Sequence, residues 1–115
     1  MISGLSVVLL TAIFSLEPKS ISEIAKISNR EIVKAGYTAN PPIKRVGHGV
    51  GLDLSEPPSI NELDDTILKE GMVLTPEPRF FVSQSERIQL EEDIIVTKDG
   101  CMMLTTGAEE LKIIN

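Results

Sequence analysis

GHGVGLDLSEPP, residues 47–58, contains the only histidine of the chain, His48, between two glycines. Glycine lacks a Cβ, so the backbone at such positions can come close to a ligand. A nucleotide-binding loop would need a helix that opens directly after these glycines. Pro57 and Pro58 would lie within the first turns of that helix, which excludes it. The stretch therefore presents one imidazole on a glycine-rich turn.

Two carboxylates downstream are candidate partners of His48. Glu77 lies between two prolines, a stiff setting that fixes the direction of its side chain, although an exposed loop position would also explain it. Glu91 begins a run of three acids in a strand-like segment, where acids are disfavoured unless they line a solvated edge. A bound cation would offset their repulsion. One imidazole and two carboxylates suit Mn, Co, Fe or Zn, so we predict a metal site from His48, Glu77 and Glu91.

The predicted elements are typical of an α+β fold, with two helices followed by a mainly antiparallel sheet. Ser20 to Glu23 form a capping box, and apolar residues recur at helical spacing from 21 to 35, before a left-handed cap at Gly36. Asp99-Gly100 favours a hairpin with a tight primed turn. The strands are expected at 43–48, 71–75, 88–91, 94–97 and 101–105, with Glu56 to Pro58 ending the segment that follows His48.

Residues 1–16 are expected to form the first helix, which is almost wholly apolar. The segment is shorter than the ~20 apolar residues of a membrane-spanning helix. It also lacks the positive charges of a secretory signal, because no lysine or arginine precedes Lys19. We therefore expect a buried helix, with a signal or membrane anchor as the alternative.

The composition fits a single globular domain of 115 residues. A net charge of −6 and an aromatic content of 3% argue against nucleic-acid binding, which uses basic clusters and stacking aromatic rings. The single cysteine, Cys101, has no partner for an internal disulfide, which indicates a cytoplasmic protein.

The segment from residue 18 onward resembles the C-terminal half of the catalytic domain of the pita-bread metallopeptidases. This family includes prolidase, aminopeptidase P (an Xaa-Pro aminopeptidase), methionine aminopeptidase and creatinase. Residues 17–37 are similar to the family's helix after its KPG turn. Three ordered stretches carry the remaining likeness: residues 47–58 resemble GHGIGLxxHExP, residues 71–78 resemble GMVxTIEPG, and residues 88–100 resemble VRIEDDVLVTxDG.

The resemblance implies a partial pita-bread fold in which residues 1–115 form one truncated metallopeptidase-like domain. It also implies a role for each candidate ligand. His48 and Glu77 would bind one metal ion, and Glu91 would bridge two ions that together promote peptide hydrolysis. The implied substrates are short peptides, often with an Xaa-Pro bond.

The sequence departs from the family pattern at several positions. The family has two further aspartate ligands upstream of the histidine, whereas no aspartate precedes Asp53 here. Ser55 occupies the place of a second histidine and cannot carry a proton near neutral pH as imidazole does. Arg79 replaces a glycine, Gln89 replaces an arginine and Pro76 replaces an isoleucine. We therefore expect no intact catalytic set and weak or incomplete metal binding.

Three functions follow from these observations. The chain is expected to be a metallopeptidase-like half-domain that is inactive alone. Alternatively, a complementary N-terminal half supplies the missing aspartates and completes the enzyme in trans. A third hypothesis is a non-catalytic binding module that forms homo-oligomers through residues 2–16.

Overall fold

The computed structural model describes residues 20–39, 44–81, 83–89, 91–105 and 114. The first predicted helix, residues 1–16, lies outside these ranges. The second predicted helix is confirmed as α2, Ile21–Lys34, with the capping box at Ser20 and Glu23. Gly36 has a φ of 92°, and Tyr37 N–H donates to Ile32 O at 3.2 Å, so the helix ends in the expected left-handed cap.

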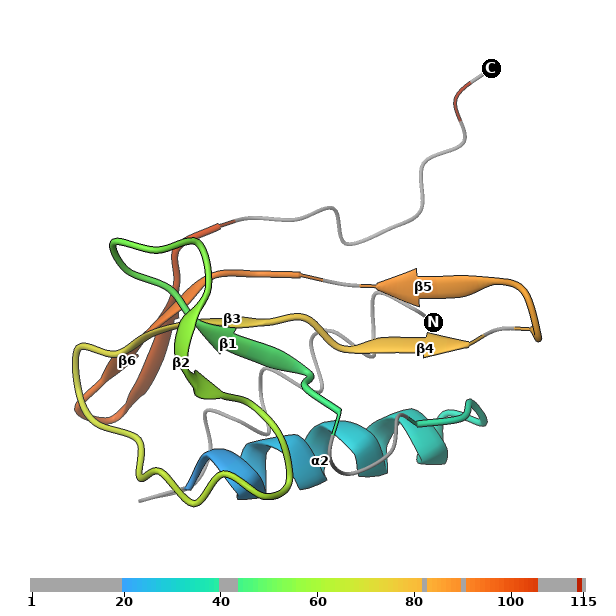
Figure 1. The fold of residues 1–115 in the computed structure, drawn as a ribbon, viewed down its shortest axis with the longest axis horizontal. Coiled ribbons are helices and arrows are strands. Elements are labelled where there is room, and N and C mark those ends of the chain that lie inside the picture. The colour runs from blue at the N-terminus through green and yellow to red at the C-terminus, as the bar shows by residue number, and fades with distance from the viewer. Residues whose placement is uncertain (1–19, 40–43, 82, 90, 106–113, 115) are drawn as a thin grey trace.

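The strands form a five-stranded antiparallel sheet and a two-stranded ribbon (Figure 1). The sheet has the order β2-β1-β3-β6-β7, and the ribbon pairs β4 with β5. The strand bounds are β1 Gly47–Gly49, β2 Glu56–Ser59, β3 Val73–Pro76, β4 Arg79–Phe81, β5 Arg87–Gln89, β6 Ile94–Thr97 and β7 Gly100–Met103. With α2 packed along one face, the described residues have the predicted α+β fold.

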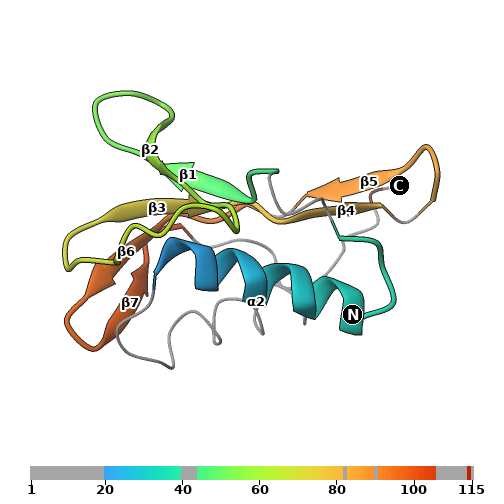
Figure 2. The same ribbon diagram turned by 60° about the horizontal axis from the view of Figure 1, so that its bottom comes forward.

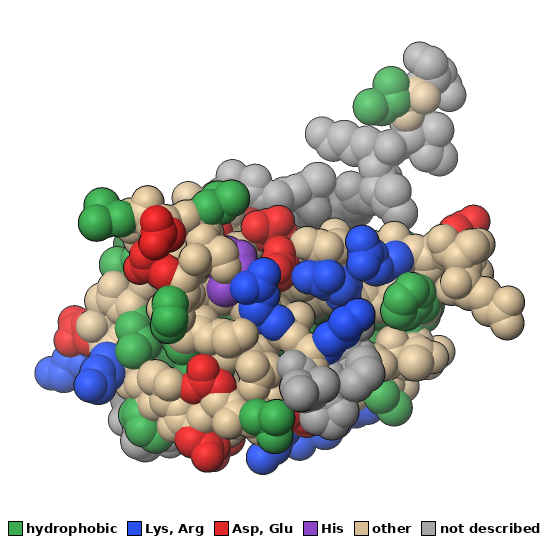
Figure 3. Space-filling view, viewed as in Figure 1, with side chains coloured by type: hydrophobic (Ala, Val, Ile, Leu, Met, Phe, Trp, Pro, Cys, Tyr) green, Lys and Arg blue, Asp and Glu red, His purple; other side chains and the backbone are tan. Residues whose placement is uncertain are grey.

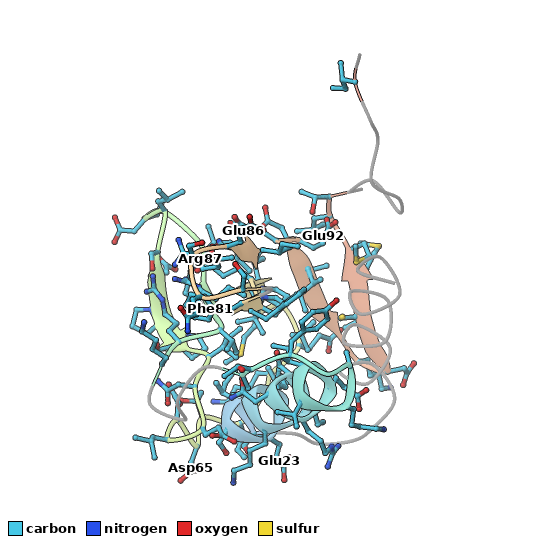
Figure 4. The ribbon with its side chains drawn as sticks, turned by 90° about the vertical axis from the view of Figure 1, so that its right-hand side faces the viewer. Glu23, Asp65, Phe81, Glu86, Arg87 and Glu92 are labelled. Carbon is cyan, nitrogen blue, oxygen red and sulfur yellow. The ribbon has the colours of Figure 1, made fainter. Side chains whose placement is uncertain are left out.

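Helix α2 covers one face of the sheet, whereas the loop between β1 and β2 projects from the other (Figure 2). Figure 4 shows the same layers, with Glu23 and Asp65 on the helix side and Glu92 on the sheet side. The main core joins both layers and contains Ile21, Ile24, Ala25, Val46, Ile60, Leu74, Ile94 and Val96. A second cluster beneath the ribbon pairs Ile32 with Phe80, whose ring lies 4.7 Å from that of Tyr37.

The sheet and the ribbon share one register. Leu74 pairs with Ile94 between β3 and β6, and Phe80 pairs with Ile88 between β4 and β5. Continuing either ladder into the interruption between them places Glu77 opposite Glu91. The hydrogen bond from Glu92 N to Pro76 O, at 3.2 Å, lies on the same register. The two ladders are therefore one long antiparallel pair, interrupted at the two glutamates.

Three predictions about strands were wrong in detail. The strand at His48 begins at Gly47 rather than near Ile43, and Glu56–Ser59 form strand β2 instead of only ending the segment. Proline is tolerated there because β2 is an edge strand. The hairpin is present, but its turn is not primed. Lys98 and Asp99 are its central residues, and no described residue other than glycine has a positive φ.

None of the helices in the described ranges is long and apolar enough to span a membrane.

Candidate metal centre

Strand alternation gives the long antiparallel pair one apolar face and one polar face. Leu74, Phe80, Ile88 and Ile94 are cross-strand pairs that pack in the two cores. The odd-numbered residues from 75 to 79 and from 89 to 93 project to the opposite face, because successive side chains of a strand point to opposite sides. This polar face carries Thr75, Glu77, Arg79, Gln89, Glu91 and Asp93. His48 joins them because it pairs with Thr75.

The flanking glycines allow β1 to fit tightly between β2 and β3. A Cβ on Gly47 would lie 2.5 Å from Thr75 O, and a Cβ on Gly49 would overlap Pro57 O. Both obstacles are backbone atoms of neighbouring strands, so they cannot move away independently. Glycine is therefore required on both sides of His48 for the imidazole to reach the polar face.

The His48 ring is buried, with 8% of the residue exposed, and one of its nitrogens is anchored to the backbone. Nδ1 lies 2.8 Å from Gly49 O, which can only accept, so Nδ1 carries the proton in this contact. Nε2, the other ring nitrogen, faces Glu77 and is the atom that could bind a metal ion. Histidine ligands of metal ions are commonly oriented by this type of hydrogen bond.

Glu77 is the buried carboxylate of the site, with 7% of the residue exposed. Its Oε1 lies 3.9 Å from His48 Nε2 and 3.5 Å from Arg79 Nη2, while Oε2 accepts a hydrogen bond of 3.0 Å from Gln89 Nε2. A buried carboxylate needs such partners, because loss of hydration is otherwise costly. Glu77 is thus an interior group with a fixed direction, and the alternative of an exposed loop position does not hold.

Glu91 completes the group of candidate ligands. One donor atom from each of His48, Glu77 and Glu91 can be chosen so that all three lie within 4.8 Å of one another. Two atoms that both bind a first-row ion at ~2.1 Å are at most ~4.2 Å apart. The separation of 3.9 Å between His48 and Glu77 satisfies this limit. Rotation of the exposed Glu91 side chain can close the remaining distance, so the residues fit a divalent ion.

A hydrogen-bonded network lies beside these three residues and was not predicted from the sequence. Thr75 Oγ1 donates to Asp93 Oδ1 at 2.7 Å, and Thr105 Oγ1 accepts from Asp93 N at 2.9 Å. Thr105 Oγ1 also donates to Glu92 at 2.6 Å. The spacing contained the signal, because Thr75 is two residues before Glu77 and Asp93 is two residues after Glu91. These hydrogen bonds connect β3 to the segment just before β6 and orient the residues around Glu91.

Ser55 lies in the exposed loop between β1 and β2. Its hydroxyl accepts a hydrogen bond of 3.1 Å from Arg45 Nη1. Leu52 and Leu54, in the same loop, have fully and almost fully exposed side chains, at 105% and 87%. The structure thus places Ser55 and two exposed leucines on this loop, and Arg45 binds Ser55 from the segment before β1.

The polar face also shows a separation of charge. Figure 3 shows the single histidine beside acidic side chains, with a group of lysine and arginine side chains next to them. Arg79 belongs to this region through its ion pair with Glu77. A site of this kind can bind a cation between its carboxylates and orient an anionic group at its basic border.

The chain is similar to known metallopeptidases in sequence and in fold. The sequence model of metallopeptidase family M24 matches residues 8–98. The Xaa-Pro dipeptidase of Pyrococcus furiosus is 39% identical over 82 residues, which cover 71% of this chain and 24% of that protein. The prolidase of Pyrococcus horikoshii has a TM-score of 0.79 at 32% identity, covering 96% of this chain and 32% of that chain. For the Xaa-Pro dipeptidase of Bacillus anthracis the TM-score is 0.80 at 28% identity, with 98% and 32% covered.

The chain spans 24% of the length of the curated Pyrococcus furiosus relative and 32% of each of the two solved chains. The similarity therefore concerns one portion of those proteins. That portion includes β1, the β3–β4 segment and the β5–β6 segment, where the three candidate ligands lie.

Proposed function

Because the chain belongs to metallopeptidase family M24, we propose that it contributes one side of a metal-dependent peptidase centre acting on peptides with an Xaa-Pro bond. The observation that carries this proposal is the convergence of His48, Glu77 and Glu91 on one face of the sheet. The relatives from Pyrococcus furiosus and Bacillus anthracis are Xaa-Pro dipeptidases, which supports this substrate class.

Each of the three candidate ligands would contribute a donor atom to the ion. His48 offers Nε2, because its Nδ1 is bound to Gly49 O. Glu77 would offer Oε1, the oxygen that faces His48 Nε2, while Gln89 holds Oε2 and Arg79 borders Oε1 at 3.5 Å. Glu91, on the exposed side, is free to rotate toward a first or a second ion. A divalent ion such as Mn or Co would supply a Lewis acid for the scissile carbonyl and make water nucleophilic near neutral pH.

We propose that these 115 residues do not hydrolyse peptides alone. A second ion would have only Glu91 from this chain, since no aspartate precedes Asp53. The two missing carboxylates would come from a polypeptide segment outside this sequence, and the exposed Leu52 and Leu54 offer that segment apolar contacts beside the site. We propose a cytoplasmic setting, in which the lone Cys101 stays reduced.

Metal titration of the purified chain tests the ligand assignment. Isothermal titration with Co²⁺ should show one site for the wild type and binding at least about 10-fold weaker for His48→Ala and Glu77→Gln. Glu86→Gln is the matched control, because Glu86 is an exposed glutamate at the tip of the ribbon. Equal binding by all four proteins would contradict the assignment.

Activity measurements test the incomplete site. The chain alone, with Co²⁺ and an Xaa-Pro dipeptide, should show no hydrolysis above buffer, and hydrolysis that disappears in Glu77→Gln would refute this expectation. A segment that supplies two aspartates should restore activity on mixing, and restoration should fail with Glu77→Gln. Persistent inactivity of such mixtures would argue against completion in trans.

A further inference from the structure

Arg79 and Gln89 hold the two oxygens of Glu77 from opposite strands. Arg79 Nη2 lies 3.5 Å from Oε1, and Gln89 Nε2 donates to Oε2 at 3.0 Å. The two residues are direct cross-strand partners in the β4–β5 ladder. They form the row next to the Glu77–Glu91 row on the same face. Each oxygen of the buried carboxylate thus has its own partner from this pair.

The two positions reach the same part of the polar face, because they are paired across the ladder. Directly opposed residues have Cβ atoms about 5 Å apart, so a long side chain from either one reaches the same space. The register therefore allows a guanidinium to reach Glu77 from either β4 or β5.

We propose that Arg79 and Gln89 form a clamp on Glu77, in which a guanidinium from β4 and an amide from β5 together fix the direction of the carboxylate. Arg79 is a positioning residue, because it acts on a metal ion only through Glu77. The inference rests on the proposed function in one respect, namely that Glu77 is a metal ligand. It assigns one shared role to two residues that face each other across the ribbon.

The clamp determines which way the carboxylate points. Gln89 fixes Oε2, so Oε1 stays on the side of His48 Nε2, 3.9 Å away. Arg79 adds a positive charge at the edge of a row that contains two glutamates, which reduces their mutual repulsion. If Arg79 instead chiefly repelled the incoming cation, its charge would weaken metal binding. These two effects predict opposite changes in metal affinity when the guanidinium is removed.

Metal titrations of the full chain with exchanges at positions 79 and 89 distinguish these two effects. Titration with Co²⁺ should show binding about 10-fold weaker for Arg79→Gly. The double variant Arg79→Gly/Gln89→Arg, which moves the guanidinium to the facing position on β5, should recover affinity to within about 3-fold of the wild type. Arg87→Gly is the matched control, because it removes an exposed arginine from the same ribbon, opposite Phe81 (Figure 4), and should leave affinity unchanged.

Two results would overturn the clamp: equal or tighter Co²⁺ binding by Arg79→Gly, or failure of the double variant to recover affinity. The visible absorption of the Co²⁺ complex gives a second readout, since it changes when a ligand leaves the ion. Arg79→Gly and Glu77→Gln should alter this spectrum in the same way. An unaltered spectrum in Arg79→Gly would also contradict the clamp.

Unfolding without metal separates failure of the clamp from failure of the proposed function. Arg79→Gly should lower the urea midpoint in the wild type but have a smaller effect in a Glu77→Gln background, where the ion pair is already lost. Equal shifts in both backgrounds would refute the clamp. Absence of Co²⁺ binding by the wild type would instead refute the proposed function, and these unfolding measurements would then decide on the clamp alone.

Discussion

Replacing Gly49 with alanine tests the packing that brings His48 to the polar face. The new Cβ would overlap Pro57 O and would lie 2.9 Å from both Glu56 O and Pro57 C. All three are backbone atoms of β2, the strand that pairs with β1 at this point. A methyl group can enter only if the two strands move apart. The φ of Gly49 is not positive, so the cost arises from contact and not from backbone strain.

Overpacking of this kind destabilises a protein by about 1–3 kcal/mol. In a chain of this size each kcal/mol lowers the melting temperature by roughly 4 °C, so we expect a decrease of about 4–12 °C. Separation of the strands would also move Gly49 O, which anchors His48 Nδ1 at 2.8 Å. Co²⁺ binding should therefore weaken by about 10-fold, the effect typical of losing a hydrogen bond that orients a ligand.

Thermal unfolding followed by circular dichroism, together with Co²⁺ titration, measures both effects. Gly51→Ala is the matched control, because its Cβ would meet only the Glu56 carboxylate, the movable end of a flexible side chain. We expect this control to shift the melting temperature by less than about 2 °C. Equal shifts for the two variants, or wild-type stability in Gly49→Ala, would refute the packing argument.

Three other predictions concern sites away from the metal centre. Ser20→Ala should reduce the free energy of unfolding by about 1 kcal/mol in urea titrations, because it removes the cap on Glu23 N; no change would contradict the capping box. Burial raises the pKa of the Cys101 thiol to about 12, so about one part in 10⁴ is thiolate at pH 8; iodoacetamide should react far more slowly with the folded than with the unfolded chain. Hydrogen bonds from Thr66 lower the pKa of Asp64 below its ordinary 3.8, which stabilises the fold above that pH. The wild type should therefore lose stability relative to Asp64→Asn as the pH falls below about 4, and parallel acid profiles would contradict this.

Local sequence signals were sufficient to predict the helix and the hairpin. Ser20, Glu23 and Gly36 act on backbone groups a few residues away, so their pattern alone predicted both ends of α2. The β6–β7 hairpin was predicted for the same reason, since its two strands are separated by a two-residue turn. The three candidate ligands were also identified from local motifs, and the structure brings them together.

Features that depend on distant partners were not predictable in this way. Strand β2 contains two prolines, and only its edge position in the finished sheet permits them. Strand β4 has only three residues, too few to show alternation, and it exists because β5 pairs with it. The clamp on Glu77 requires a register between residues ten positions apart. Such a register depends on the tip of the ribbon, whose geometry the local sequence does not define.

The common register of the two ladders also makes chain length a constraint on this protein. Removing one residue between β3 and β4 would turn each later side chain of β4 over, so that Arg79 would enter the core and Phe80 would meet water. Exchanges of residue type leave this register intact. Divergence along the long antiparallel pair should therefore proceed by substitution, with insertions and deletions confined to the tip between Phe81 and Arg87 and to the β6–β7 turn.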